Sequence, residues 1–342
     1  MTNQRGFASD NYAGIHPAVL DAIGNVNQGH QVAYGEDSET ERFQEVVREL
    51  FGPNAEGFPV FNGTGANVIA LQAATQRWEA VICVESAHIH VDEGGAPEKM
   101  AGLKLWNLPT PDGKLTPEIV ETAMFDIGSV HRAQPGVISI TNTTELGTLY
   151  TAAEIKALAE YAHKHNLLLH LDGARLSNAA AALGMRFKQF TTDVGVDIVS
   201  FGATKIGAMA AESVVVLNPD LVNAMPYLRK TSMQLASKMR FVSAQIIALL
   251  ENDLWRRNGE HANAMAKRLD AGLRAMGVEI PNPTEANAVF PIFTEAQTAK
   301  LQESYRFYVW NYATGQVRLM CAWDTTEADV DGMLAAVKSV LA

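Results

Sequence analysis

The sequence has little cysteine, no long hydrophobic run and no excess of basic residues. Its two cysteines, Cys83 and Cys321, lie far apart, each within an apolar stretch. This arrangement favours two buried, reduced thiols over a disulfide or a metal pair. No apolar run approaches the ~20 residues that span a bilayer, and residues 1–10 lack the apolar core of a signal peptide. We therefore expect a cytoplasmic protein without a membrane partner and without a metal site.

The charged residues give an acidic surplus. Lysine and arginine number 27 against 38 aspartate and glutamate residues, so the formal net charge is −11. A polyanion would be repelled by such a protein, and we do not expect nucleic acid as a partner. With 342 residues, 47% of them hydrophobic, the chain can bury a sizeable core and form a large and a smaller domain.

Short apolar runs alternate with amphipathic helical patterns over the first part of the chain. Residues 39–51 and 153–165 each place their apolar side chains on one stripe of a helix. The apolar runs are typical of buried strands in a parallel sheet. They comprise residues 80–84, 137–141, 167–171, 197–201 and 213–217. This alternation predicts an α/β fold with helices on both faces of the sheet.

The pattern changes near residue 235. Two long helical patterns, three strand patterns and a last helix follow. They are expected over residues 234–250, 261–276, 288–293, 306–310, 316–321 and 326–341. We therefore predict a large α/β domain over residues 1–235 and a small C-terminal α+β domain over residues 236–342.

Two of the predicted strands end in residues that carry chemistry. One leads into Asp172, and another leads into a loop of small residues around Lys205. Ligands of open α/β sheets bind at the carboxyl ends of strands. Asp172 is thus placed to face a cationic ligand atom, or else caps the next helix. Burial lowers the pKa of a lysine, which can then form a Schiff base; the alternative for Lys205 is an exposed loop position.

Further positions are suited to other parts of a ligand. Gly63, Thr64 and Gly65 follow a strand-like stretch and open a helix, as in a phosphate site or a plain tight turn. His88, just past a strand, can stack on a flat ring or lie in a loop without a role. Arg318 is a cation inside an apolar strand and needs an anion, either a substrate carboxylate or a nearby acidic side chain.

Together these residues describe one kind of ligand. A phosphate site, a stacking side chain, an acid for a ring nitrogen, a Schiff-base lysine and an arginine suit pyridoxal 5'-phosphate (PLP) holding an amino acid. A nicotinamide-dependent dehydrogenase is a distant alternative. Its G-x-G-x-x-G fingerprint is incomplete here, because Val68 occupies the place of the third glycine. That alternative also leaves Lys205 and Arg318 without a function.

The chain resembles the low-specificity L-threonine aldolase family of fold-type I PLP enzymes. The matching segments are Phe7-Ala8-Ser9-Asp10, Ala33-Tyr34-Gly35, Gly63-Thr64-Gly65-Ala66-Asn67, Ala87-His88, His170-Leu171-Asp172-Gly173-Ala174-Arg175, Thr204-Lys205, Leu235-Ala236-Ser237-Lys238-Met239-Arg240-Phe241 and Arg318 through Trp323-Asp324-Thr325. The resemblance implies a large domain with a mostly parallel, seven-stranded sheet and PLP as the cofactor. It implies cleavage of L-threonine, L-allo-threonine and related β-hydroxy-α-amino acids to glycine and an aldehyde. It also implies a homodimer or homotetramer with sites at the subunit interface.

The resemblance assigns four residues to the cofactor ring. Lys205 is implied to carry PLP, and Asp172 to pair with the pyridine nitrogen. Arg175 is implied to hydrogen-bond the phenolic oxygen of the ring, and His88 to stack on the ring. Together they set Lys205, Asp172 and His88 as the expected catalytic residues.

The phosphate and the substrate have implied contacts of their own. Gly63 and Thr64, with Gly65 beside them, are implied to hold the phosphate. The residues implied to contact the substrate are Ser9, Arg175 and Arg318.

One departure from the family concerns the base. Many members have Asn-Thr-His-Asn where this chain has Asn-Thr-Thr-Glu over residues 142–145. A second active-site histidine is therefore missing at Thr144. We expect His88 to take the β-hydroxyl proton, either directly or through a water molecule held by His90 or Glu145.

The nearest alternative reaction also uses PLP. It is β-elimination, as in the related tyrosine- and tryptophan-cleaving lyases, which needs a leaving group on the β-carbon and an aromatic pocket. Glycine and an aldehyde are the products of the aldolase reaction, whereas pyruvate and ammonia are the products of β-elimination.

Overall fold

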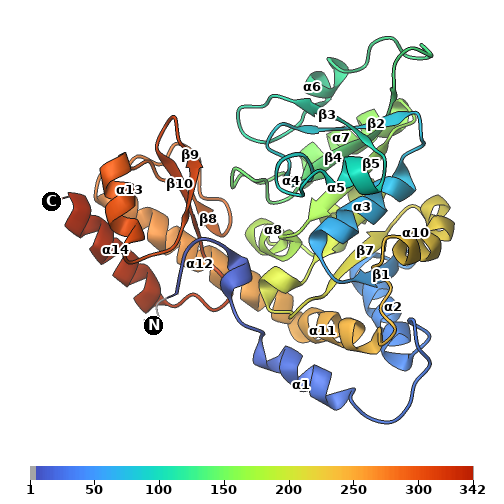
Figure 1. The fold of residues 1–342 in the computed structure, drawn as a ribbon, viewed down its shortest axis with the longest axis horizontal. Helices are drawn as coiled ribbons and strands as arrows, with labels where there is room; N and C mark the ends of the chain where they lie inside the picture. The colour runs from blue at the N-terminus through green and yellow to red at the C-terminus, as the bar shows by residue number, and fades with distance from the viewer. Residues whose placement is uncertain (1–4, 342) are drawn as a thin grey trace.

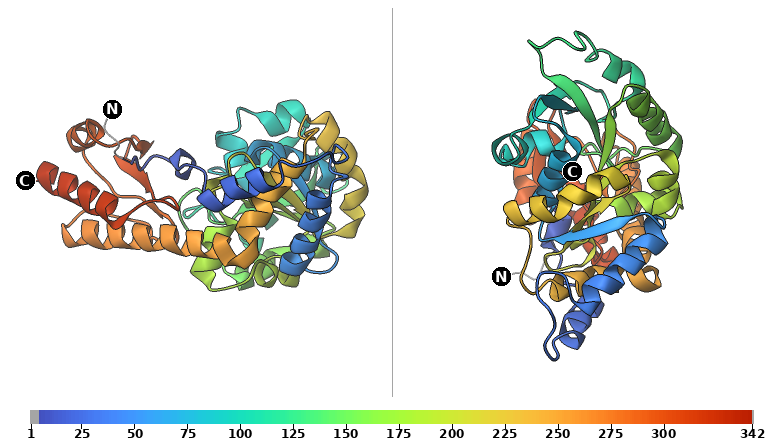
Figure 2. Two further views of the ribbon diagram at one scale, coloured as in Figure 1. Left: turned by 90° about the horizontal axis from the view of Figure 1, so that it is seen from below. Right: turned by 90° about the vertical axis from the view of Figure 1, so that its right-hand side faces the viewer.

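The computed structural model describes residues 5–341, which form a larger and a smaller lobe (Figure 1). The larger lobe is built on a seven-stranded sheet and the smaller on a three-stranded sheet. The helix α12 (Leu254–Ala275) extends from the larger lobe into the smaller one. In the larger lobe it packs on α8 (Leu176–Leu183), and in the smaller lobe it packs on α14 (Glu327–Leu341). Figure 2 shows α12 running straight along one side of both lobes.

The large sheet is mostly parallel. Its strands are β1 (Glu56–Val60), β2 (Glu79–Val84), β3 (Lys104–Leu108), β4 (Gln134–Thr141), β5 (Leu168–Gly173), β6 (Ile198–Gly202) and β7 (Glu212–Val216). They lie in the order β1-β7-β6-β5-β4-β2-β3. β7 runs antiparallel to both β1 and β6, and the other pairs are parallel. The expected α/β fold is thereby confirmed.

Helices cover this sheet. The α-helices of the large lobe are α1 (Pro17–Asn25), α2 (Ser38–Phe51), α3 (Gly63–Ala74), α4 (His88–Val91), α5 (Ala96–Met100), α6 (Pro117–Glu121), α7 (Ala152–Lys164), α8, α9 (Phe187–Phe190), α10 (Met225–Thr231) and α11 (Arg240–Leu250). The 3-10 helices are η1 (Asp10–Tyr12), η2 (Thr192–Val194), η3 (Thr204–Ile206), η4 (Pro219–Ala224) and η5 (Glu251–Asp253).

Two helices were predicted closely, and their ends have local causes. The patterns over residues 39–51 and 153–165 correspond to α2 and α7. The side chain of Asp37 accepts the N–H of Thr40 at 2.8 Å and so caps α2. A capping box formed by Thr151 and Glu154 begins α7.

The small lobe consists of an antiparallel sheet packed on helices. Its elements are β8 (Ala288–Val289), α13 (Glu295–Gln302), β9 (Tyr308–Asn311), β10 (Gln316–Met320) and α14, with part of α12. The N-terminal segment joins this lobe: the N–H of Phe7 donates to the carbonyl of Arg306 at 2.9 Å, and the N–H of Met320 donates to the carbonyl of Phe7 at 2.8 Å. Figure 1 accordingly places both ends of the described chain at the small lobe.

Each lobe has its own hydrophobic cluster. Buried residues of the large lobe, up to Trp255, form one cluster. Phe7 and residues from Met265 onward form the other. The passage from one hydrophobic cluster to the other therefore falls within α12, which favours a domain boundary inside that helix. The division at residue 235 stays a prediction from sequence alone.

Several predicted elements differ from the structure. The strand over residues 213–217 was expected to be parallel, which is wrong, because β7 is antiparallel to its neighbours. The helix expected from residue 234 begins at Arg240, and the one expected from residue 261 already begins at Leu254. The strand expected over residues 288–293 ends at Val289, shortly before Pro291, which has no N–H to pair. β3 was not predicted.

The predictions for the cysteines agree with the structure. Cys83 and Cys321 are both free and buried. In residues 5–341 no group of three or more metal-ligating side chains is present. No helix in this part of the chain combines the length and the apolar character needed to cross a membrane.

Candidate active site

A pocket between the lobes brings most of the predicted residues together. It lies where β5 and β6 end, and it is closed from the other side by the small lobe. Its lining includes Ser9, His88, Arg175, Lys205 and Arg318. An adjoining pocket shares three of these residues and adds Gly63 and Asp172. Thr64 and Gly65 line neither pocket.

Asp172 is held rigidly at the end of β5. Its side chain is buried, with the residue 3% exposed. Oδ1 accepts the N–H of Ala174 at 2.9 Å, and Oδ2 accepts the side-chain amide of Asn67 at 2.8 Å. Asn67 lies on α3, so the helix that follows the glycine segment also fixes the carboxylate.

His170, two residues before Asp172, links three strands. Its Nδ1 and Nε2 lie 2.9 Å from the hydroxyls of Ser139 and Ser200, on β4 and β6. Burial lowers the pKa of His170 to about 4, so the ring is neutral near pH 7. It therefore fixes the strands below Asp172 without bringing a positive charge to that carboxylate.

Lys205 lies on η3, directly after β6. Within residues 5–341 no carboxylate lies within ion-pair distance of it, although the charges of Asp10, Asp172 and Glu212 act on it. Burial lowers the pKa of Lys205, and the nearby charge of Arg175 acts in the same direction. Beneath it, Glu212 accepts the N–H of Ala203 at 2.7 Å, and burial raises the pKa of Glu212 to about 7. A lysine with a lowered pKa is a better nucleophile at neutral pH.

Gly202 explains how the ends of β5 and β6 approach so closely. A Cβ atom at this position would lie 2.3 Å from the carbonyl oxygen of Ala174. A side chain would therefore separate the segment that carries Asp172 from the one that carries Lys205.

Arg175 is fixed by a buried, bidentate ion pair. Its Nε and Nη2 donate to Asp10 at 2.7 and 3.0 Å. Asp10 also accepts the side-chain amide of Asn287 at 3.2 Å. The N-terminal segment, the large lobe and the small lobe thus meet at this one carboxylate.

His88 begins α4 and is held by Glu93. Its Nδ1 lies 2.8 Å from Oε1 of Glu93, whose side chain is fully buried. Because a carboxylate only accepts hydrogen bonds, Nδ1 carries the hydrogen, and Nε2 remains for another partner. This hydrogen bond raises the pKa of His88 against the opposing effect of burial.

Arg318 presents an unpaired guanidinium. Nη2 donates to the carbonyl of Ala8 at 3.1 Å, and Nε is buried without a partner. The guanidinium lies 4.7 Å from the ring centre of Trp310 and 5.5 Å from that of Tyr308. Burial lowers its pKa to about 10, which leaves it charged near pH 7. Within residues 5–341 it has no acidic partner, so the structural ion pair considered from the sequence is not found there. Ser9 lines the same pocket.

The glycine segment begins α3. The side chain of Asn62 accepts the N–H of Gly65 at 2.7 Å and caps the helix. The N–H groups of Gly63 and Thr64 have no partner in the described structure. A Cβ atom on Gly65 would lie 2.4 Å from the side chain of Gln234, so this glycine permits a close contact.

The two candidates for holding a water molecule lie in different places. His90 is exposed, and its Nε2 lies 2.7 Å from the side-chain amide of Asn107, outside both pockets. Glu145 lines both pockets. Thr144, where a family histidine is missing, is buried with its hydroxyl 2.7 Å from that of Thr148.

Four residues of the site were not predicted as such. Asp10 and Asn67 lie within segments that carry the family resemblance, and this was the available signal for them. Glu93 and Asn287 have no local signal, because their roles come from contacts with His88 and Asp10 that only the fold creates.

Comparisons with known proteins agree with this geometry. The model of the beta-eliminating lyase family matches residues 6–296. The low specificity L-threonine aldolase of Pseudomonas sp. (strain NCIMB 10558) is 41% identical over 345 residues, which cover 100% of this chain and 99% of the relative. The low specificity L-threonine aldolase of Pseudomonas aeruginosa is 42% identical, with 93% of each chain covered.

Solved structures support the same assignment. The threonine aldolase of Leishmania major superposes with a TM-score of 0.93 and 32% identity, covering 98% of this chain and 99% of that one. Aspartate aminotransferase from Thermus thermophilus superposes with a TM-score of 0.73 at 17% identity, covering 98% of this chain and 90% of that one, and shares the fold. The chain therefore belongs to the beta-eliminating lyase family and, within it, to the low specificity L-threonine aldolases.

Proposed function

We propose that this protein is a PLP-dependent aldehyde-lyase that cleaves L-threonine, L-allo-threonine and related β-hydroxy-α-amino acids to glycine and an aldehyde. One observation carries the proposal: Lys205 and Arg318, two cations that form no direct ion pair within residues 5–341, line the same pocket. The lysine is suited to bind an aldehyde cofactor covalently, and the arginine is suited to bind a carboxylate. The names of the Pseudomonas relatives support the same reaction.

The residues around Lys205 fit PLP. Asp172 offers a buried carboxylate to the ring nitrogen. Gly63 and Thr64 offer N–H groups at the start of a 12-residue helix to the phosphate, and no atom lies within 4 Å of a Cβ built on Gly63. When bound, PLP supplies a ring that accepts the electron pair released at the substrate Cα.

The side chains proposed to contact the PLP ring have a hydrogen-bond donor or a ring face that no other residue occupies. Arg175 uses Nε and Nη2 for Asp10, which leaves Nη1 for the phenolic oxygen of the ring. His88, held at Nδ1 by Glu93, is proposed to stack on the ring. Asp172 keeps the ring nitrogen protonated, because its negative charge stabilises the N–H form.

The substrate is proposed to lie between the ring site and the small lobe. Arg318 and Ser9 bind its α-carboxylate, which fixes the orientation of the bonds at Cα. A wider cleft of about 610 Å³ adjoins these residues and is also lined by Tyr308 and Trp310. This space supports the acceptance of β-substituents larger than the methyl group of threonine.

We further propose a homodimer or homotetramer. Tyr34, Phe61 and Met233 carry exposed large apolar side chains. The N–H of Phe61 donates to the side chain of Gln234, the neighbour of Met233 in sequence, at 2.9 Å, and Nζ of Lys230 lies 4.8 Å from the ring centre of Tyr34. Exposed apolar side chains that gather in one region are typical of protein interfaces. Light scattering should give at least twice the mass of one chain, and replacement of Phe61 and Met233 by aspartate should lower that mass.

Product analysis tests the function. The purified protein with PLP should show a visible absorbance band and convert L-threonine to equal amounts of glycine and acetaldehyde. Pyruvate and ammonia from β-substituted substrates would instead support the β-eliminating alternative. Absence of both product pairs would overturn the proposal.

A further inference from the structure

The carboxyl group of Glu145 is buried in the site, and only one of its two oxygens has hydrogen-bond partners. Oε1 accepts the backbone N–H of His88 and the hydroxyl of Thr141, both at 2.9 Å. Oε2 is buried and has no hydrogen-bond partner. The residue lines both pockets that contain Lys205. An unpartnered carboxylate oxygen in a ligand pocket is a candidate for a direct contact with the ligand.

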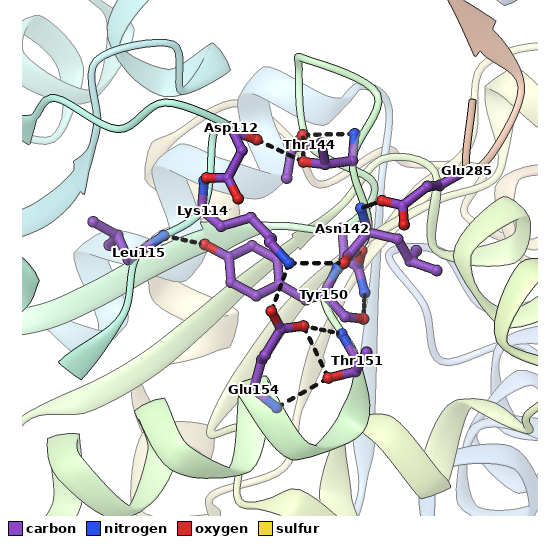
Figure 3. Close-up of polar contacts among 11 residues, drawn as sticks. Asp112, Lys114, Leu115, Asn142, Thr144, Tyr150, Thr151, Glu154 and Glu285 are labelled. Atoms are coloured by element: carbon purple, nitrogen blue, oxygen red, sulfur yellow. Dashed lines mark hydrogen bonds and ion pairs between the residues drawn. The ribbon is translucent and has the colours of Figure 1, made fainter. Parts of the chain in front are cut away.

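The loop that carries Glu145 is fixed within the large lobe. The side chain of Asn142 accepts the N–H of Tyr150 at 3.1 Å, and the N–H of Leu115 donates to the hydroxyl of Tyr150 at 2.5 Å. Lys114 donates to Glu154 at 2.5 Å and to the carbonyl of Leu149 at 3.3 Å. Figure 3 shows these contacts converging on the segment that follows β4.

The small lobe holds the same loop from the other side. Glu285 accepts the N–H of Leu149 at 2.7 Å, and the side-chain amide of Asn282 donates to the carbonyl of Leu146 at 3.3 Å (Figure 3 shows Glu285). The loop is thus held from both lobes, and Glu145 keeps a defined position relative to Lys205 and Arg318.

The charges around Glu145 come from several elements. Asp172 on β5 has the same sign, while Arg175 and Lys205 have the opposite sign. On the α4 side, His88 and Glu93 line the same pocket, and the buried thiol of Cys83 and the phenol of Tyr150 also lie near enough to be affected by the charge of Glu145. Burial is the main cause that raises the pKa of Glu145, and Asp172 adds to it. A carboxylate with a raised pKa is a stronger base whenever it is ionised.

We propose that Glu145 is the base that takes the β-hydroxyl proton of the substrate. In this step the O–H bond breaks and its proton passes to Oε2, while the oxygen forms the carbonyl of the aldehyde. The Cα–Cβ bond breaks, and its electron pair remains at Cα. Glu145 then releases this proton and one proton adds to Cα, which gives glycine, so no proton is gained or lost overall. This inference rests on the proposed function.

The contacts of His88 favour this assignment over the histidine. Nδ1 of His88 is occupied by Glu93, so only Nε2 is left for the substrate, whereas Oε2 of Glu145 has no partner. The sequence places Glu145 directly after Thr144, where other family members have a histidine. A carboxylate thus provides the proton acceptor near the position that lacks the imidazole.

The first experiment compares Glu145→Gln with the wild type. The amide keeps the shape of the side chain but cannot take a proton. We expect kcat for threonine cleavage to fall by about 10²- to 10⁴-fold. Glycine affinity and exchange of the glycine α-proton in D₂O should change little, because neither involves a β-hydroxyl. Glu160→Gln, an exposed position on α7, is the matched control and should behave as the wild type.

The pH dependence gives a second readout. The wild type should lose kcat/KM toward acid pH with an apparent pKa above that of an ordinary glutamate. Thr141→Val removes a hydrogen bond that stabilises the carboxylate, so the acid limb should move to higher pH. An acid limb that stays in place in both Thr141→Val and Glu145→Gln would overturn the proposal.

The apo-protein provides a test that needs no turnover. Because the pKa of Glu145 is raised on folding, the folded state binds this proton more tightly than the unfolded state. Stability of the wild type therefore falls as pH rises from about 4.5 through the raised pKa. Glu145→Gln has no carboxyl group that titrates at this position. The free energy of unfolding of Glu145→Gln, relative to that of the wild type, should therefore increase as pH rises over this range. Parallel stability curves would contradict an enclosed, titrating Glu145.

The outcomes separate the two proposals. If the wild type forms no glycine and aldehyde, the proposed function fails. If the wild type cleaves threonine and Glu145→Gln cleaves it equally well, the assignment of Glu145 fails alone. If Glu145→Gln does not fold, the Thr141→Val profile decides, since this variant leaves the carboxyl group in place.

Discussion

The side-chain amide of Asn67 donates to Oδ2 of Asp172 at 2.8 Å, and the same nitrogen lies 2.8 Å from Oε1 of Glu93. One amide thus fixes two buried carboxylates. His88 is attached to the second of them at 2.8 Å. The acid proposed for the ring nitrogen and the imidazole proposed for the ring face therefore belong to a single hydrogen-bonded network.

This network predicts the effect of Asn67→Leu. The substitution keeps the volume but leaves Oδ2 of Asp172 without a hydrogen-bond donor, which costs about 1–3 kcal/mol. We expect the Kd for PLP to rise by about 5- to 150-fold, measured by absorbance titration of the apo-protein. Gln76→Leu, at an exposed position, is the control. An unchanged Kd for Asn67→Leu would show that Asp172 does not depend on the amide.

The role of Lys205 predicts where PLP becomes attached. After reduction of the PLP-loaded protein with borohydride, the cofactor should be found on the peptide that contains Lys205. Lys205→Ala should lose both the visible band and turnover, whereas Lys230→Ala should keep the band. Recovery of the label on Lys230 or Lys238 would refute the assignment.

The unpaired guanidinium of Arg318 predicts a large effect of a small change. Arg318→Lys keeps the charge but loses the planar fork that binds a carboxylate through two hydrogen bonds. We expect a loss of about 2–4 kcal/mol in kcat/KM, or about 30- to 1000-fold. Arg274→Lys, in a surface ion pair, should leave kcat/KM unchanged. If Arg318→Lys is also unchanged, the arginine serves only the fold.

The pair of His88 and Glu93 predicts a pH-dependent stability. Because Glu93 raises the pKa of His88 in the folded state, its stabilisation is fully present below about pH 6.5, the unfolded pKa, and is lost as pH rises through the folded pKa. The stability lost on Glu93→Gln should therefore be largest in acid and smaller in alkali. Urea unfolding of the apo-protein from about pH 5.5 to about pH 8.5 measures this difference. An equal difference at every pH would exclude the raised pKa.

Local sequence patterns predicted which segments of the large lobe form helices and strands better than they predicted whether a strand runs parallel or antiparallel. The stripe of apolar residues in α2 depends on helix period alone, and the first residue of α2 depends on the cap formed by Asp37. Both features could therefore be read from the sequence. β7 is apolar throughout, and such a run is compatible with either strand direction. Its antiparallel orientation follows from the path of the chain between η3 and β7.

Some residues of the site could likewise be predicted from local sequence patterns, and others could not. The positions of Asp172 and Lys205 were predictable because Asp172 lies at the end of one parallel strand and Lys205 shortly after the next. Glu93 and Asn287 were not, because Glu93 acts through its contact with His88 and Asn287 through its contact with Asp10, and no local sequence pattern marks either contact. Glu145 was recognised as a departure from the family, but its buried, unpartnered oxygen became evident only in the folded chain.

The attachment of the N-terminal segment has a consequence for the order of assembly. Phe7 hydrogen-bonds Arg306 and Met320, and Ala8 accepts a hydrogen bond from Arg318. During synthesis on the ribosome these partners emerge about three hundred residues after the segment itself. The large sheet can form beforehand, but the carboxylate-binding part of the site is completed only after residues 306–320 have been synthesised. A nascent chain that is stalled before β10 would hold a folded sheet and an incomplete catalytic centre.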